Sequence, residues 1–197
     1  MIALGFEILA VILAIAYLLL AARESILCWY CAFASSLIFV FLFWDVSLLM
    51  ESMLNIFYVV MAVVGWRQWK FGGKTDGELA ISTLQLWQHG VIIGLMLSLA
   101  LINGWLLTRY TSAAWPYLDS FTTWASLITT FMVVFKVLEN WLYWFLIDSI
   151  SIYLYIDREL YLTALLFFAY VIIVVFGYIN WRKTYQLAGQ KQAALTP

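Results

Sequence analysis

The chain has 197 residues, of which 66% are hydrophobic and 11% are charged, and its net charge at neutral pH is −1. Its mean hydropathy is +0.97. Such a chain carries too few charges to cover a soluble globule of this size, so the composition excludes a soluble domain and predicts an integral membrane protein. The near-neutral charge and the lack of basic runs exclude a nucleic-acid-binding protein.

Apolar stretches of about 20 residues, the length that crosses a bilayer, follow one another along the whole sequence. Only two prolines occur in the chain, and a backbone that faces lipid has to satisfy its hydrogen bonds within helices. The first stretch lacks a basic residue ahead of it and is longer than a signal-peptide core, so we expect it to remain as a span. The sequence predicts an all-α integral membrane protein whose seven transmembrane helices lie near residues 2–22, 25–44, 47–67, 84–107, 117–136, 139–156 and 160–181.

The first three and the last three helices carry similar residues. A shift of 115 positions superimposes Glu24 on Glu139, Trp29 on Trp144, Trp66 on Trp181 and Arg67 on Arg182. Asp45 meets Asp157 only at a shift of 112, so we expect loop lengths that differ between the two copies. We therefore expect a 3+1+3 arrangement of parallel repeats with a substrate path between them. The predicted segments are a first bundle (1–70), a cytoplasmic linker (71–83), a connecting helix (84–110), a second bundle (111–184) and a polar, frayed tail (185–197).

The distribution of basic residues predicts the orientation. An N-terminus outside the cell leaves only Arg109 and Arg158 on the outer side. The other basic residues then face the cytoplasm, in agreement with the positive-inside rule. They are Arg23, Arg67, Lys70, Lys74, Lys136, Arg182, Lys183 and Lys191.

Polar side chains at membrane depth are costly, so they mark candidate sites. On the sixth helix Asn140, Trp144 and Asp148 follow one another at i, i+4 and i+8 and share one face. Asp148 follows three apolar residues, and an ionised side chain at this depth needs water, a partner or a cationic ligand. Amide, indole and carboxylate groups on one face suit an organic cation that carries hydroxyls.

The third and fifth helices add further polar groups to the candidate site. Glu51, Asn55 and Tyr58 share a face of the third helix. The fifth helix contributes Asp119, Thr123 and Ser126. Glu51 and Asp119 also lie near helix starts, where an acid is stabilised by the helix dipole or the headgroup region without any substrate.

Other chemistries have weaker support. Cys28 and Cys31 form a CxxC pair inside an apolar helix, which leaves a membrane thiol-redox protein as an alternative, but the cytoplasmic side is reducing and no second cysteine pair relays electrons. The single histidine, His89, has no partner for a metal site, and we expect it to form an interfacial or interhelical hydrogen-bond patch with Gln85 and Gln88. No catalytic residues, metal ligands, nucleotide-binding loop or cofactor are predicted.

The sixth helix also carries the motif of a known family. The run from Leu138 to Trp144 (LENWLYW), followed by IDSISI from Ile147, resembles the E-N-W-x-x-W signature of the PnuC family of bacterial vitamin transporters. Further matches occur in the fifth helix, at PYLDS from Pro116, and in the third, at NIFY from Asn55 with Gly65-Trp66 and Trp69. The resemblance covers about residues 6 to 184.

The resemblance implies a fold similar to SWEET sugar transporters, a homotrimer in the bacterial inner membrane, and uptake of nicotinamide riboside by facilitated diffusion, with a cytoplasmic kinase trapping the product. By matching positions, Asn140 and Trp144 would contact the substrate, with Trp141 and Glu139 completing the motif. Asn55 departs from the glutamine frequent in the family at that position, and Glu51 adds an acid. Thiamine, another cationic aromatic vitamin, is therefore the alternative substrate.

Overall fold

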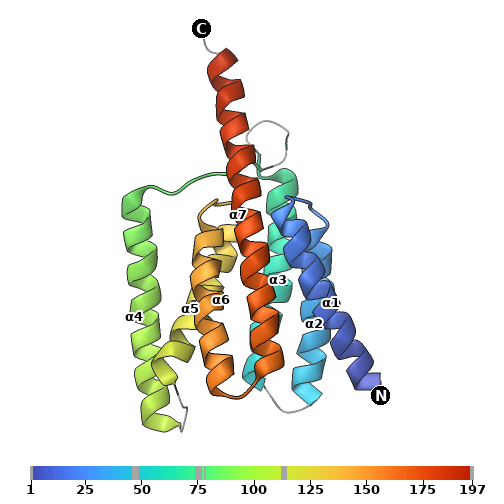
Figure 1. Cartoon of the computed structure of the whole chain (residues 1–197), viewed down its shortest axis with the longest axis vertical. Helices are drawn as coiled ribbons and strands as arrows, with labels where there is room; N and C mark the ends of the chain where they lie inside the picture. The colour runs from blue at the N-terminus through green and yellow to red at the C-terminus, as the bar shows by residue number, and fades with distance from the viewer. Residues whose placement is uncertain (1, 46–48, 74–76, 78, 112–114, 196–197) are drawn as a thin grey trace. The chain divides into compact units, whose positions relative to one another are not determined.

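The described residues form seven helices, which confirms the predicted all-α fold (Figure 1). The computed structural model describes residues 2–45, 49–73, 77, 79–111 and 115–195. Four helices, α1, α2, α4 and α7, are long and apolar enough to cross a membrane. The helix bounds are α1 Ile2–Ala22, α2 Cys28–Asp45, α3 Leu49–Phe71, α4 Leu86–Tyr110, α5 Pro116–Val134, α6 Asn140–Asp157 and α7 Tyr161–Leu195.

Local sequence explains where several helices begin. Pro116 opens α5, a position where the missing amide proton has no intrahelical acceptor to lose. Gln85 precedes α4 and forms a capping box with Gln88, whose side-chain oxygen accepts a 2.7 Å hydrogen bond from the Gln85 amide. The corner before α6 contains Lys136 with a positive φ of 48°, which turns the chain sharply between α5 and α6.

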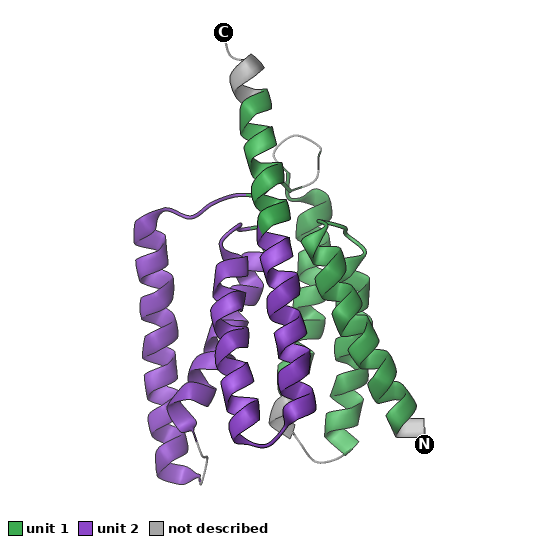
Figure 2. Cartoon of the chain, viewed as in Figure 1, with its two compact units in different colours: residues 1–81, 134–136, 179–197 green, residues 82–133, 137–178 purple. Residues whose placement is uncertain are grey.

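Contacts divide the chain into two compact units (Figure 2). Unit 1 comprises residues 1–81, 134–136 and 179–197, and unit 2 comprises residues 82–133 and 137–178. Unit 1 therefore holds α1, α2, α3 and the end of α7, whereas unit 2 holds α4, most of α5, α6 and the first half of α7. The helix α7 is continuous through both units.

Within unit 1, α2 packs against both α1 and α3. The Ser35 hydroxyl donates to the Ala10 carbonyl at 2.8 Å, which ties α2 to α1. The Ser52 hydroxyl donates to the Val40 carbonyl at 2.9 Å, which ties α3 to α2. These bonds satisfy buried hydroxyls between apolar helices, where an unpaired polar group is costly.

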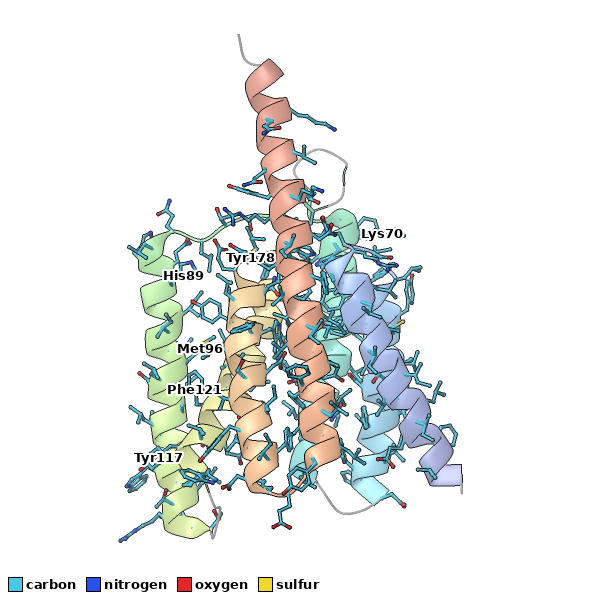
Figure 3. All side chains as sticks on the ribbon, in the orientation of Figure 1. Lys70, His89, Met96, Tyr117, Phe121 and Tyr178 are labelled. Carbon is cyan, nitrogen blue, oxygen red and sulfur yellow. The ribbon has the colours of Figure 1, made fainter. Side chains whose placement is uncertain are left out.

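Within unit 2, α4, α5 and α6 share a small apolar core that we call the Met96 cluster, made of Met96, Ala125 and Ile147. Figure 3 shows Met96 and Phe121 near the middle of the unit, with His89 toward one end. His89 stacks on Tyr143 at 5.9 Å between ring centroids. Its Nδ1 lies 2.8 Å from the Tyr143 hydroxyl, and this confirms the predicted interhelical hydrogen-bond patch.

Helix boundaries correct the expected offset of the internal repeat. The ends of α1 and α5, both ends of α2 and α6, and the starts of α3 and α7 all differ by 112 positions. At this offset Trp29 corresponds to Trp141 and not to Trp144. The turns after α1 and after α5 are also the same. The Ser25 amide donates to the Leu20 carbonyl and the Val137 amide donates to the Met132 carbonyl, both at 2.9 Å. The expectation of unequal loops between these helices was wrong.

The end of the linker is hydrogen-bonded to the residues before α6, and the tail is helical. The Leu138 amide donates to the Ser82 carbonyl at 2.8 Å, and the Glu139 carboxylate accepts from the Leu84 amide at 3.3 Å. The expected frayed tail is instead helical, because α7 continues as far as Leu195. Linker residues 74–76 and 78 and tail residues 196–197 lie outside the described part of the chain.

Candidate functional site

The α6 face predicted to bind substrate is polar and buried. Asn140 is the first residue of α6 and is completely buried, and its Nδ2 donates to the Val137 carbonyl at 2.6 Å. Asp148, two turns further along, is only 4% exposed. Trp144 lies between them on the same face and is half-buried.

Two polar groups on this face lack partners within the described residues. The Oδ1 atom of Asn140 is buried and accepts no hydrogen bond there. Asp148 has no hydrogen bond or ion pair among the described side chains. An unsatisfied amide oxygen costs about 1–3 kcal/mol, and an unpaired buried carboxylate costs more. A polar, cationic ligand would relieve both costs at once.

Tyr170 of α7 is a neighbour of Asp148 that the sequence analysis missed. The phenol lies close enough to the carboxylate for the two groups to interact electrostatically. Tyr170 also packs on Phe167 with ring centroids 5.4 Å apart, and Phe167 packs on Tyr155 of α6 at 5.0 Å. A tyrosine within the apolar run FFAYVII was the available signal, since a phenol there needs a polar neighbour.

Helix α5 places further unpaired polar atoms inside unit 2. The Ser120 and Thr129 hydroxyls and the Trp124 indole nitrogen are buried and have no hydrogen-bond partner among the described residues. Sequence reasoning selected other polar residues of α5. Burial depends on which face packs against a neighbour, and the α5 sequence carries polar groups on several faces.

The α5 residues that were predicted lie elsewhere. Thr123 is exposed, and its hydroxyl donates to the Asp119 carbonyl at 2.9 Å. Asp119 pairs with Arg158, whose Nη2 lies 3.6 Å from Oδ1. Arg158 follows the end of α6, about 27 Å from Asn140 at a rise of 1.5 Å per residue. Asp119 therefore lies at the opposite end of α6 from Asn140.

The α3 residues belong to unit 1 and are described there by themselves. Asn55 and Tyr58 are half-buried. Tyr58 meets Phe57 edge to face, with centroids 5.6 Å apart. The side chain of Glu51 lies outside the described residues.

The two tryptophans of the motif have different surroundings. Trp144 packs against the Met96 cluster and keeps part of its ring accessible. Trp141 is 1% exposed and lies against Gly177 of α7, where an added Cβ would come within 2.7 Å of the ring. Trp141 therefore fixes the packing of α6 on α7, and Trp144 is the more available of the two for a ligand.

The cysteine pair forms no disulfide. Cys28 and Cys31 are both free thiols in α2, and Cys28 is fully buried. A small buried thiol behaves as an apolar side chain. This surrounding does not favour the thiol-redox alternative, since reactive cysteines occupy exposed, electropositive sites.

Comparison with known proteins identifies the family. Residues 4–183 match the family described as nicotinamide mononucleotide transporter. The chain belongs to this family. Two similar relatives are the nicotinamide riboside transporters PnuC of Escherichia coli (strain K12) and Shigella flexneri, each 23% identical over 187 residues that cover 82% of this chain and 78% of the relative.

A solved structure confirms the fold. The crystal structure of the vitamin B3 transporter PnuC matches with a TM-score of 0.73 and 20% sequence identity, covering 92% of this chain and 82% of the solved one. The family match over residues 4–183, with the PnuC relatives, confirms the predicted membership of the PnuC family. As a member of the nicotinamide mononucleotide transporter family with several apolar helices, the chain is a multi-pass membrane transporter and not an enzyme.

Proposed function

We propose that this transporter carries nicotinamide riboside into the cell. The observation that carries the proposal is the buried α6 face, on which the Asn140 Oδ1 accepts no hydrogen bond and the Asp148 carboxylate has no ion-pair partner among the described side chains. A pyridinium ring supplies the positive charge that Asp148 needs, and ribose hydroxyls supply donors for Asn140. The similar PnuC proteins named as nicotinamide riboside transporters support this choice.

The charge of the α6 face favours the riboside over the mononucleotide. Asp148 is an acid, and Asn140 and Trp144 on the same face are neutral. A phosphate group placed along this face would meet a like charge in a poorly solvated site, which is unfavourable. Arg158, at the end of the helix, is already paired with Asp119. We therefore infer that a phosphate-free cation is the preferred substrate.

Binding to the purified protein tests the substrate directly. We expect nicotinamide riboside to raise the melting temperature, because a ligand at 100 times its Kd stabilises the folded state by about 2.7 kcal/mol. Nicotinamide mononucleotide is the matched control, since it differs by one phosphate. A rise in melting temperature with thiamine and none with the riboside would instead support the thiamine alternative. Asn55 and Glu51, which depart from the family pattern, are the residues that suggest this alternative.

The proposed mechanism is facilitated diffusion by alternating access, without coupling to an ion. Uptake into proteoliposomes should therefore follow the riboside gradient at an unchanged rate after sodium is removed and after the proton gradient is collapsed by an ionophore. Loss of uptake under either condition, with substrate binding intact, would contradict the uncoupled mechanism.

The cellular setting is part of the same proposal. We place the protein in the bacterial inner membrane as a homotrimer, with the N-terminus outside and the C-terminus in the cytoplasm. The excess of basic residues on the predicted cytoplasmic side supports this orientation. A cytoplasmic kinase that phosphorylates the riboside would keep the product inside and maintain the inward gradient.

A further inference from the structure

Unit 1 contains an ion pair, between a buried lysine and a glutamate that is 19% exposed, that the substrate site does not use. Lys136 is 4% exposed, and its Nζ lies 3.4 Å from the Glu24 Oε2. The same ammonium lies 4.6 Å from the centre of the Trp69 ring. Carboxylate and aromatic face together compensate a cation that has lost its water, whereas either one alone does so poorly.

The two charged residues occupy the same position in the two copies of the repeat. Glu24 follows α1 and Lys136 follows α5, at the offset of 112 that relates the helix ends. Both have positive φ, 56° for Glu24 and 48° for Lys136, in a region that non-glycine residues seldom adopt. Opposite charges therefore meet at two equivalent, strained corners.

Residues of α3 and α7 contact the region around the Glu24–Lys136 pair. Trp69 near the end of α3 packs on Trp181 of α7 with centroids 5.8 Å apart. The Trp181 indole donates to the Ala21 carbonyl at 2.9 Å, and the Asn180 amide donates to the Ala22 carbonyl at 2.9 Å. The last residues of α1 are thereby held by α7, and the α5–α6 corner is held to them through Lys136.

We propose that Glu24, Lys136 and Trp69 form a latch that keeps this end of the transporter closed and that opens once in each transport cycle. This inference rests on the transport function, since an end that opens is needed only in a carrier. A buried pair suits a latch because its closed state is well defined. Separating the charges exposes both to water, which compensates part of the lost contact.

Cys28 supplies a natural reporter of the latch. It is fully buried, and it lies four positions after Glu24 in the chain. In the Cys31→Ala background, we expect N-ethylmaleimide to label Cys28 slowly in proteoliposomes. Lys136→Met and Glu24→Gln each remove one charge of the pair, so each should accelerate labelling about tenfold. A tenfold change in the open population corresponds to about 1.4 kcal/mol.

Two control variants make the test specific. Lys136→Arg keeps the charge and the contact with an aromatic face, so it should label as slowly as the parent protein. Lys70→Met removes an exposed ammonium that lies 5.0 Å from the Trp66 ring, and it should also leave labelling unchanged. Nicotinamide riboside should accelerate labelling of the parent and have little effect on Lys136→Met.

The outcomes separate the latch from the substrate proposal. Equal labelling of Lys136→Met, Glu24→Gln and the parent would overturn the latch even if the riboside is transported. Faster labelling of both variants without added riboside, at an unchanged melting temperature and with altered uptake, would support it even if another vitamin is the substrate. If both variants label faster only with a lowered melting temperature and unchanged uptake, the pair is a static brace and the latch is wrong.

Discussion

Replacing Asp148 by Asn is expected to weaken nicotinamide riboside binding by about tenfold to a hundredfold without lowering the melting temperature of the empty protein. The substitution keeps the shape of the side chain and removes its charge. A hydrogen bond or contact to a charged group contributes about 1.5–3 kcal/mol, which corresponds to this range of affinity. Calorimetric titration with the riboside would give the change.

The empty protein should tolerate this change because the carboxylate is only 4% exposed and has no ion-pair partner among the described residues. Removing an uncompensated buried charge relieves a cost of folding. Asp45→Asn, at the exposed end of α2, is the matched control and should leave affinity and melting temperature unchanged. A less stable Asp148→Asn variant with normal affinity would show that Asp148 serves the fold and not the substrate.

Alanine at Gly177 or Gly65 is expected to lower the free energy of unfolding by about 1–3 kcal/mol, the usual effect of overpacking. A Cβ on Gly177 would lie 2.7 Å from the Trp141 ring, and a Cβ on Gly65 would overlap the Trp29 ring. Both indole rings are almost fully buried, so they have little room to move. Thermal unfolding in detergent, followed by circular dichroism, would measure the loss.

Gly90 and Gly94 of α4 are the matched controls, since no heavy atom lies within 4 Å of an added Cβ at either position. Alanine there should be neutral or stabilise the protein by up to about 1 kcal/mol, because alanine favours the helix more than glycine does. If Gly177→Ala behaved like Gly94→Ala, the contact between Trp141 and α7 would contribute little to stability.

The sequence predicted the helices well and their internal correspondence poorly. The seven helices of the described residues were predicted in the right order, because a membrane leaves the backbone few other choices, although length and apolar composition mark four of them, α1, α2, α4 and α7, as candidate spans. The repeat offset was wrong because tryptophans are frequent in this chain, so Trp29 finds a match at both Trp141 and Trp144. The helix ends and the turns at Glu24 and Lys136 support the offset of 112, and the positive φ values of these turns occur without a glycine that would have indicated them.

The candidate site was predictable where a helical period places charged or amide groups in an apolar helix, as for Asn140 and Asp148. It was not predictable for Ser120, Thr129 and Tyr170, whose polar atoms are compatible with many surroundings. Serine and threonine often bond to their own helix, as Ser151 does to the Ile147 carbonyl at 2.9 Å. Whether such a hydroxyl stays unpaired depends on packing that the sequence does not specify.

The continuous α7 has a mechanical consequence. Its 35 residues contain no proline, and at 1.5 Å per residue they make a rod of about 52 Å. The α7 residues up to Tyr178 belong to one compact unit and those from Ile179 belong to the other. The helix backbone itself therefore joins the two units. A torque applied to either end is passed along the rod and across that junction.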